Sequence, residues 1–199
     1  MGRTSTARER LLAATDDLMR HRGYTSLGVA EICAAAEVRK GSFYHFFDSK
    51  QALTLEVVDG YWTAQREQWH AALTGDGPAL GRLRRLLEGM AAVQRDTRRD
   101  SGTVAGCLLG NLALELSTQE PEVRARLERI FDEQVELVAT TLREAAEAGA
   151  VPHERATADT ARAVIAQLEG LVLFAKLKND PSVLDGLWPH TLLLVDGRE

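Results

Sequence analysis

The sequence has little cysteine and no long uncharged apolar run. Cys33 and Cys107 are the only two cysteines among 199 residues, too few for the disulfide framework of a small secreted protein. No stretch approaches the roughly 18 apolar residues of a membrane span. Residues 1–10 are polar and charged, without the apolar core of a secretory signal. We therefore expect a cytoplasmic protein with no membrane partner.

Enzymatic motifs are also missing. The sequence contains no Gly-rich phosphate loop, nucleophile elbow or His-Glu-x-x-His motif. One Glu-x-x-His, from Glu67 to His70, has the spacing used in di-iron helical bundles, but such a site needs a second copy and two further glutamates. We expect no catalytic site, no metal and no cofactor.

Helical patterns run through the whole sequence, which predicts an all-α fold. No alternation of Val, Ile or Thr suggests a strand, and Leu11, Ala14 and Leu18 show the three- and four-residue steps of an amphipathic helix. The second helix is expected to begin at a Thr25 or Ser26 cap and to end near residue 36. The other helices are expected at 4–21, 40–46, 50–73, 79–97, 103–117, 122–148, 155–178 and 182–195.

Charge is distributed unevenly along the chain. The net charge is −5, yet residues 1–50 hold eight Lys or Arg against six Asp or Glu, and the remainder holds sixteen against twenty-three. A mildly basic N-terminal part on an acidic body suits a DNA-binding domain joined to a separate domain, although many solvated helical faces have a similar balance.

The short third helix carries the most informative residues. Small or donor-bearing groups of this kind contact base edges and phosphates, and they occur at Lys40, Gly41, Ser42, Tyr44 and His45. Gly41 lowers helix propensity by about 1 kcal/mol relative to Ala, which hints that something approaches closely there. Phe43, Phe46 and Phe47 are expected to hold this helix, because so short a helix cannot stand alone.

Residues 10–55, and above all 38–53, resemble the DNA-binding region of the tetracycline-repressor (TetR) family, and Gly23, Tyr24 and Thr25 also match. The resemblance implies an N-terminal three-helix helix-turn-helix DNA-binding domain in residues 1–50. It also implies a C-terminal helical ligand-binding and dimerisation domain in residues 51–199. The expected function is a repressor that binds a palindromic operator in double-stranded DNA as a dimer and is released by a small-molecule inducer.

The resemblance also implies roles for individual residues. Those expected at the major groove are Lys40, Gly41 and Ser42, and those expected at phosphates are Tyr44, His45, Lys50, Thr25 and Ser26. The last two would act from the N-terminus of the second helix. Arg39 departs from the family pattern, which often has a capping Ser or Thr there. Arg39 cannot cap in that way but can add a phosphate or guanine contact, so we expect different operator preferences. Without the family pattern, Tyr44 and His45 would be an ordinary amphipathic surface.

Relatives of this kind dimerise through two late helices, and the candidates here are 122–148 and 155–178. Residues 161–175 are apolar nearly all round, which predicts burial on two sides. One side would face its own domain and the other a second subunit. The alternative is the central helix of a monomeric core.

The segment 102–116 is the second feature of interest. Gly102, Gly106 and Gly110 recur at four-residue steps, and on a helix they would share one face and leave room beside it. The Gly-Cys-Leu sequence at residues 106–108 and Asn111 resemble a subgroup of the family. Some of that subgroup sense small reactive or acidic metabolites, and in some the cysteine is the sensor. The alternative function is therefore an electrophile- or redox-sensing repressor that acts through Cys107. The other interpretation of Cys107 is a small buried hydrophobic residue with no sensing role.

An inducer pocket is expected among the helices near 55–73, 79–97, 103–117 and 161–176. Aromatic or polar groups on otherwise apolar helices are its candidate contacts, and they are Tyr61, Trp62, Trp69, Gln94, Cys107, Asn111, Glu115 and Glu169. Either tryptophan could equally be a core residue with no ligand contact. Any one of the polar groups could equally be a solvent-exposed side chain. A DNA-binding regulator without a ligand is a further alternative.

Overall fold

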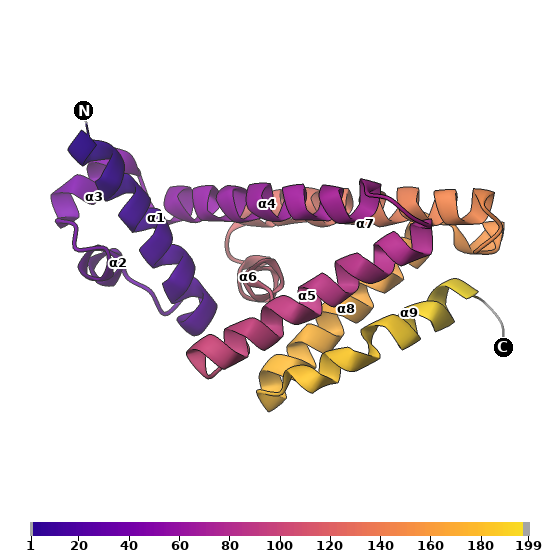
Figure 1. Cartoon of the computed structure of the whole chain (residues 1–199). Coiled ribbons are helices and arrows are strands. Elements are labelled where there is room, and N and C mark those ends of the chain that lie inside the picture. The colour runs from indigo at the N-terminus through magenta and orange to yellow at the C-terminus, as the bar shows by residue number, and fades with distance from the viewer. Residues whose placement is uncertain (1, 197–199) are drawn as a thin grey trace. The chain divides into compact units, whose positions relative to one another are not determined.

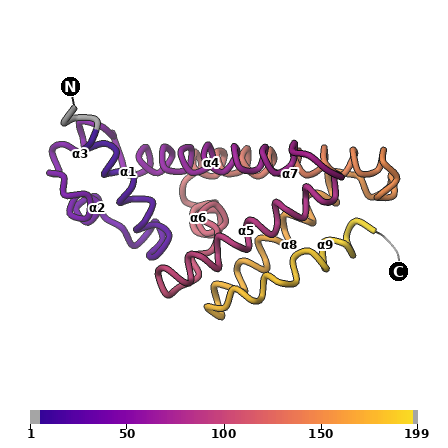
Figure 2. Tube along the Cα trace, in the orientation of Figure 1, coloured from indigo at the N-terminus to yellow at the C-terminus, as the bar shows by residue number. Residues whose placement is uncertain are grey.

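The computed structural model describes residues 2–196, with side chains from residue 6 onward. These residues form only helices, and no strand occurs among them (Figures 1 and 2). The helices are α1 (Gly2–Arg22), α2 (Val29–Ala35), α3 (Lys40–Phe46), α4 (Lys50–Thr74), α5 (Ala79–Ser101), α6 (Leu108–Leu116), α7 (Pro121–Glu147), η1 (His153–Arg155), α8 (Ala158–Lys178), η2 (Pro181–Gly186) and α9 (Leu187–Asp196). The all-α class is confirmed, and α3 has the bounds expected from the sequence.

The second helix begins later than expected. Its N-cap is Gly28, in an extended conformation (φ −98°, ψ 153°), and α2 starts at Val29. Glu31 reaches back to accept a hydrogen bond from the Gly28 N–H at 3.0 Å, so a first-turn carboxylate satisfies the helix start instead of a hydroxyl. The prediction of a cap at Thr25 or Ser26 was wrong.

Residues 102–107 form a connector instead of a helix. Gly102 and Gly106 have φ values of +81° and +82°, in the left-handed region that ends helices. The Gln94 side chain holds the connector, because its Nε2 donates to the Gly106 carbonyl at 3.2 Å and its Oε1 accepts from the Gly106 N–H at 3.1 Å. The predicted helical face of Gly102, Gly106 and Gly110 was therefore wrong.

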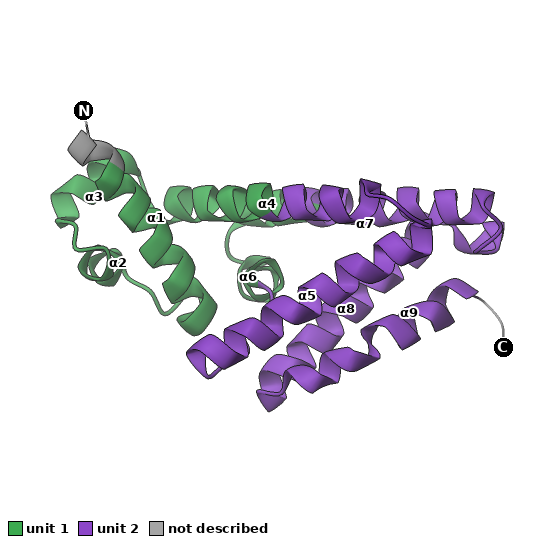
Figure 3. Cartoon of the chain, viewed as in Figure 1, with its two compact units in different colours: residues 1–64, 108–128 green, residues 65–107, 129–199 purple. Residues whose placement is uncertain are grey.

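The chain divides into two compact units (Figure 3). Unit 1 lies within residues 1–64 and 108–128, and unit 2 within residues 65–107 and 129–199. The predicted domain boundary at residue 50 falls inside unit 1. Unit 1 packs around fully buried side chains that include Leu11, Ile32, Phe43 and Leu53. Figure 1 shows α1, α2 and α3 gathered at the N-terminal end of α4.

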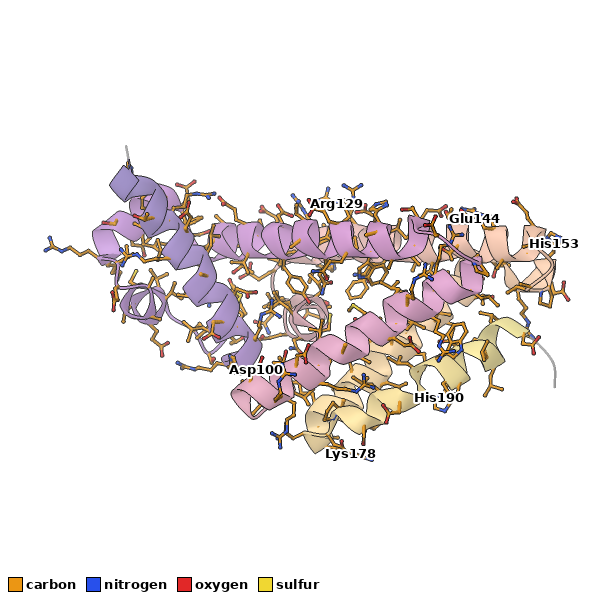
Figure 4. All side chains as sticks on the ribbon, in the orientation of Figure 1. Asp100, Arg129, Glu144, His153, Lys178 and His190 are labelled. Carbon is orange, nitrogen blue, oxygen red and sulfur yellow. The ribbon has the colours of Figure 1, made fainter. Side chains whose placement is uncertain are left out.

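Unit 2 contains α5, η1, α8, η2 and α9, with the later parts of α4 and α7. Helix α8 packs against both η2 and α9, and α5 contacts the same two elements. Glu144 of α7, labelled in Figure 4, forms an ion pair with Arg82 of α5. Among the described residues, no helix has the length and apolar character that crossing a membrane requires.

Candidate nucleic-acid interface

Buried side chains fix the orientation of α3. Phe43 has no exposed surface and Phe47 only 3%, and their ring centroids lie 5.8 Å apart. On α2, Ile32 and Cys33 are buried, and the Cys33 carbonyl accepts a hydrogen bond from the Val38 N–H at 2.9 Å across the turn to α3. The aromatic face of α3 is therefore the inner face, as expected.

The opposite face of α3 is open. Lys40, Gly41, Tyr44 and His45 are exposed, and Ser42 is half-buried. A Cβ added at Gly41 would meet nothing within 4 Å, so packing within the described chain does not require glycine there. The polar edge predicted to contact DNA is turned outward.

Arg39 occupies the position before α3 and does not cap it with its side chain. Its backbone is extended (ψ 142°) and its side chain makes no capping hydrogen bond, while its carbonyl accepts from the Ser42 N–H at 2.8 Å. The exposed guanidinium stays available for a contact outside the chain.

Thr25 and Ser26 lie in the α1–α2 connection (residues 23–28), ahead of α2. The Ser26 hydroxyl donates to the Arg22 carbonyl at 2.8 Å, so it closes the end of α1. The Thr25 N–H donates to Glu115 at 2.6 Å. The expected position of these two residues at the N-terminus of α2 was wrong, because that helix starts at Val29, and their phosphate contacts stay a prediction.

Lys50 is also engaged inside unit 1. Its Nζ donates to the carbonyls of Tyr24 at 3.1 Å and Leu27 at 2.9 Å, and it lies 3.8 Å from the centroid of the Tyr24 ring. Burial lowers the pKa of Lys50, against the opposing effect of the Glu120 and Glu115 charges. Lys50 therefore holds the α1–α2 connection, and its expected contact with the DNA backbone stays a prediction.

Two carboxylates contact the same region, Glu115 of α6 and Glu120 directly before α7. Glu115 accepts from the Tyr24 N–H at 2.8 Å in addition to the Thr25 N–H. Glu120 accepts from the Tyr24 hydroxyl at 2.7 Å and from Gln51 Nε2 at 2.8 Å. Burial and the bond to Glu120 raise the pKa of Tyr24. We call Tyr24, Lys50, Gln51, Glu115 and Glu120 the carboxylate clasp.

Glu115 was expected to contact the inducer. In the structure its carboxylate accepts hydrogen bonds from the Tyr24 and Thr25 N–H groups. Burial raises its pKa, but the hydrogen bonds from Thr25 and Tyr24 and the charge of Lys50 together hold the pKa below its ordinary value. Sequence reasoning missed Glu120 and Gln51 altogether, because no local pattern links residues about 70 to 96 positions apart.

The other inducer candidates have varied surroundings. Trp62 is 6% exposed and Trp69 1%, as either core or pocket residues would be. Tyr61 lies beneath the Arg20 guanidinium, 4.7 Å from its ring centroid. The Gln94 side-chain amide is hydrogen-bonded at both its nitrogen and its oxygen to Gly106 of the connector. Asn111 has a buried Nδ2 with no hydrogen-bond partner, which leaves it a candidate.

Cys107 and Glu169 lie together in unit 2. Burial raises the pKa of Glu169, and a hydrogen bond from Cys107 opposes this effect. Burial lowers the pKa of Lys176, and negative charge at Cys107 opposes that effect. Cys33 and Cys107 are both buried. Among the residues with described side chains, no group of three His, Cys, Asp or Glu could hold a metal ion.

Sequence comparisons match both halves of the chain. Residues 11–57 match the family "Bacterial regulatory proteins, tetR family", and residues 79–191 match "Tetracyclin repressor-like, C-terminal domain". The transcriptional regulator AcuR of Cereibacter sphaeroides is 34% identical over 90% of this chain and 81% of its own length. The HTH-type transcriptional repressor DhaR of Mycobacterium sp. (strain GP1) is 31% identical over 93% of this chain and 89% of its own.

Solved structures agree with these matches. A regulatory protein TetR from Rhodobacter sphaeroides superposes with a TM-score of 0.83 at 30% identity, covering 93% of this chain and 96% of its own. The reduced form of Escherichia coli NemR superposes with a TM-score of 0.75 at 25% identity, covering 95% and 97%. Proteins of this kind are DNA-binding regulators and not enzymes. With both of its parts matched, this chain belongs to the TetR family of transcriptional regulators.

Proposed function

We propose that this regulator is a repressor that binds a palindromic operator as a homodimer and leaves it when a small molecule binds. The observation that carries the proposal is the outward polar face of α3 above its buried aromatic face. A helix held in this way fits the major groove, and a dimer would place two of them about 34–36 Å apart, one turn of DNA. Lys40, Gly41 and Ser42 would face bases, whereas Arg39, Tyr44 and His45 would contact phosphates or flanking bases.

Substitutions on α3 test the DNA-binding role. The duplex is one selected by the wild-type protein from a random library, and affinity is measured by fluorescence anisotropy at several salt concentrations. Lys40→Ala should weaken binding by about 1–3 kcal/mol if the lysine reads a base. Arg129→Ala, at an exposed arginine of α7 (Figure 4), removes the same charge and should leave affinity within twofold. Equal affinities of the two variants would contradict the role of Lys40.

The dimer surface we propose is formed by α8 and α9. Exposed large hydrophobic side chains gather there, at Leu173 (51%), Phe174 (52%), Leu177 (75%), Leu192 (36%) and Leu193 (72%). Helix α7 exposes no large hydrophobic side chain among the described residues, so we replace the expected 122–148 helix with α9. A second copy would cover these side chains and keep two copies of α3 on one duplex.

Sedimentation measures the assembly. Leu177→Glu should shift the protein to a monomer and weaken operator binding at least tenfold. Val93→Glu, at a half-exposed valine of α5, introduces the same carboxylate outside the proposed surface and should leave a dimer. A dimeric Leu177→Glu protein would refute this surface.

We further propose that the inducer contacts a buried polar atom of α6. Asn111 Nδ2 is buried without a hydrogen-bond partner, and an unsatisfied buried polar group costs about 1–3 kcal/mol, which a ligand could recover. A thermal-shift screen of small polar metabolites, followed by release of labelled duplex, would identify it. If no stabilising compound changes the affinity for the duplex, the result favours a regulator that binds DNA without responding to a ligand.

Sensing through Cys107 is the second candidate. A cation near a thiol favours the reactive thiolate, and Lys176 interacts electrostatically with Cys107. Electrophiles such as N-ethylmaleimide should then release the wild-type protein and Cys33→Ser from DNA but not Cys107→Ser. Release of Cys107→Ser at the wild-type rate would exclude this mechanism.

A further inference from the structure

The α1–α2 connection presents two successive N–H groups to one carboxylate. Gly23 has a φ of +75°, and backbone turned in this way forms a concavity of N–H groups that binds anions. Glu115 fills it, with its oxygens 2.8 Å from the Tyr24 nitrogen and 2.6 Å from the Thr25 nitrogen. A Cβ added at Gly23 would lie only 2.9 Å from Glu115 Oε2, so the carboxylate rests directly against the backbone.

We propose that Glu115 is a positioning residue for DNA binding. Its carboxylate holds the α1–α2 connection, and through it α2 and α3, in the conformation that fits the duplex. The inference rests on the proposed DNA-binding role of α3. Because Glu115 lies on α6, this helix sets the geometry of the helix-turn-helix through the carboxylate contact. Both belong to unit 1.

The connection depends on this contact because side chains satisfy several of its peptide groups. Within the connection, the Leu27 N–H donates to the Tyr24 carbonyl at 3.0 Å. Lys50 binds the carbonyls of Tyr24 and Leu27 on one side, and Glu115 binds N–H groups on the other. Hydrogen bonds to ionised groups are about twice as strong as neutral ones. Removing Glu115 therefore leaves the Tyr24 and Thr25 N–H groups without their carboxylate partner.

A positioning role and a simple charge effect predict opposite changes in affinity. Removing a negative charge favours binding to the phosphate backbone. Removing a positioning contact lowers the fraction of protein in the binding-competent conformation, and the apparent affinity falls by that fraction. The sign of the change therefore separates the two effects.

The experiment compares Glu115→Gln with Glu128→Gln in the full-length protein, using the same selected duplex. Glutamine has one acceptor oxygen, and its amide group would bring donors toward the second N–H. Glu128 is an exposed carboxylate on α7 in the same unit, so the charge change is matched. We expect E115Q to bind about tenfold more weakly, corresponding to a tenfold loss of competent protein, and E128Q to bind as tightly as wild type or tighter.

Hydrogen exchange supplies a readout that does not depend on DNA. The peptide that contains Tyr24 and Thr25 should exchange at least tenfold faster in E115Q than in E128Q. Acetate, compared with chloride at equal ionic strength, should slow this exchange and restore affinity in Glu115→Ala by occupying the vacated concavity. Glu115→Asp, which keeps the charge on a shorter side chain, should lie between wild type and E115Q and serves if E115Q does not fold.

The outcomes are distinguishable. Equal affinity of E115Q and E128Q, or unchanged exchange at Tyr24 and Thr25, would overturn the role of Glu115 while leaving the proposed function intact. A wild-type protein that binds no duplex would overturn the proposed function, whereas the exchange and acetate measurements would still report on the contact itself.

Discussion

Replacing Gly23 with alanine tests the contact between the Glu115 carboxylate and the α1–α2 connection by changing the backbone instead of the carboxylate. The φ of Gly23 is +75°, and an L-residue pays about 1–2 kcal/mol in the left-handed region. The new Cβ would also lie 2.9 Å from Glu115 Oε2 and 3.3 Å from Oε1. The carboxylate must therefore move away from the two N–H groups, which adds about 1–3 kcal/mol for the donors left poorly paired.

Gly149→Ala supplies the matched control. Its φ is +71°, and an added Cβ would meet nothing within 4 Å, so it pays the conformational cost alone. Urea unfolding followed by circular dichroism should show a loss of about 1–2 kcal/mol for Gly149→Ala. Gly23→Ala should lose about 2–5 kcal/mol, the sum of the backbone and contact costs.

A double-mutant cycle isolates the contact. In a Glu115→Ala background the carboxylate is absent, so Gly23→Ala should cost only as much as Gly149→Ala. The coupling between Gly23 and Glu115 should then be about 1–3 kcal/mol. Additive effects of the two substitutions would refute the claim that the carboxylate rests on the connection.

Phe43→Ala should lower the unfolding free energy by about 3–5 kcal/mol, because the ring has no exposed surface, whereas Tyr44→Ala at a ring 53% exposed should cost much less in the same urea titration. Gln94→Leu should cost about 1–3 kcal/mol for each Gly106 group left unpaired and should speed protease cleavage within residues 102–107. The stabilisation from Glu115 should depend on pH: because its folded pKa is lowered, its contribution is present above the unfolded pKa of about 4.3 and is lost as pH falls through the folded pKa. Urea titrations of wild type and Glu115→Gln should therefore converge in acid, and a difference that persisted there would contradict the ionic contact.

Periodicity predicted helices well where the backbone stays right-handed. Helix α3 matches its expected bounds, since Phe43 and Phe47 supply a buried face that a single sequence displays directly. The same reasoning failed at residues 102–107, because a four-residue repeat of glycine looks identical whether glycine lies in a helix or ends one. Gly106 is bound on both its peptide groups by the Gln94 side chain, a tertiary contact that no local pattern reveals.

The polar residues show why a site is harder to predict than a fold. Lys50 and Glu115 were assigned to DNA and to an inducer from their type and position, yet they bind opposite edges of one connection. A charged side chain acts on whichever partner the fold brings near it, and Glu115 lies about 90 residues from its donors. Because Glu115 is carried by α6, the helix that directly follows Cys107 and the Gln94-bound connector, displacement of α6 by an ångström or so would stretch hydrogen bonds that weaken beyond about 3.2 Å. A shift of α6 would therefore reach the α1–α2 connection through the Glu115 hydrogen bonds, and Glu115→Gln should weaken that coupling.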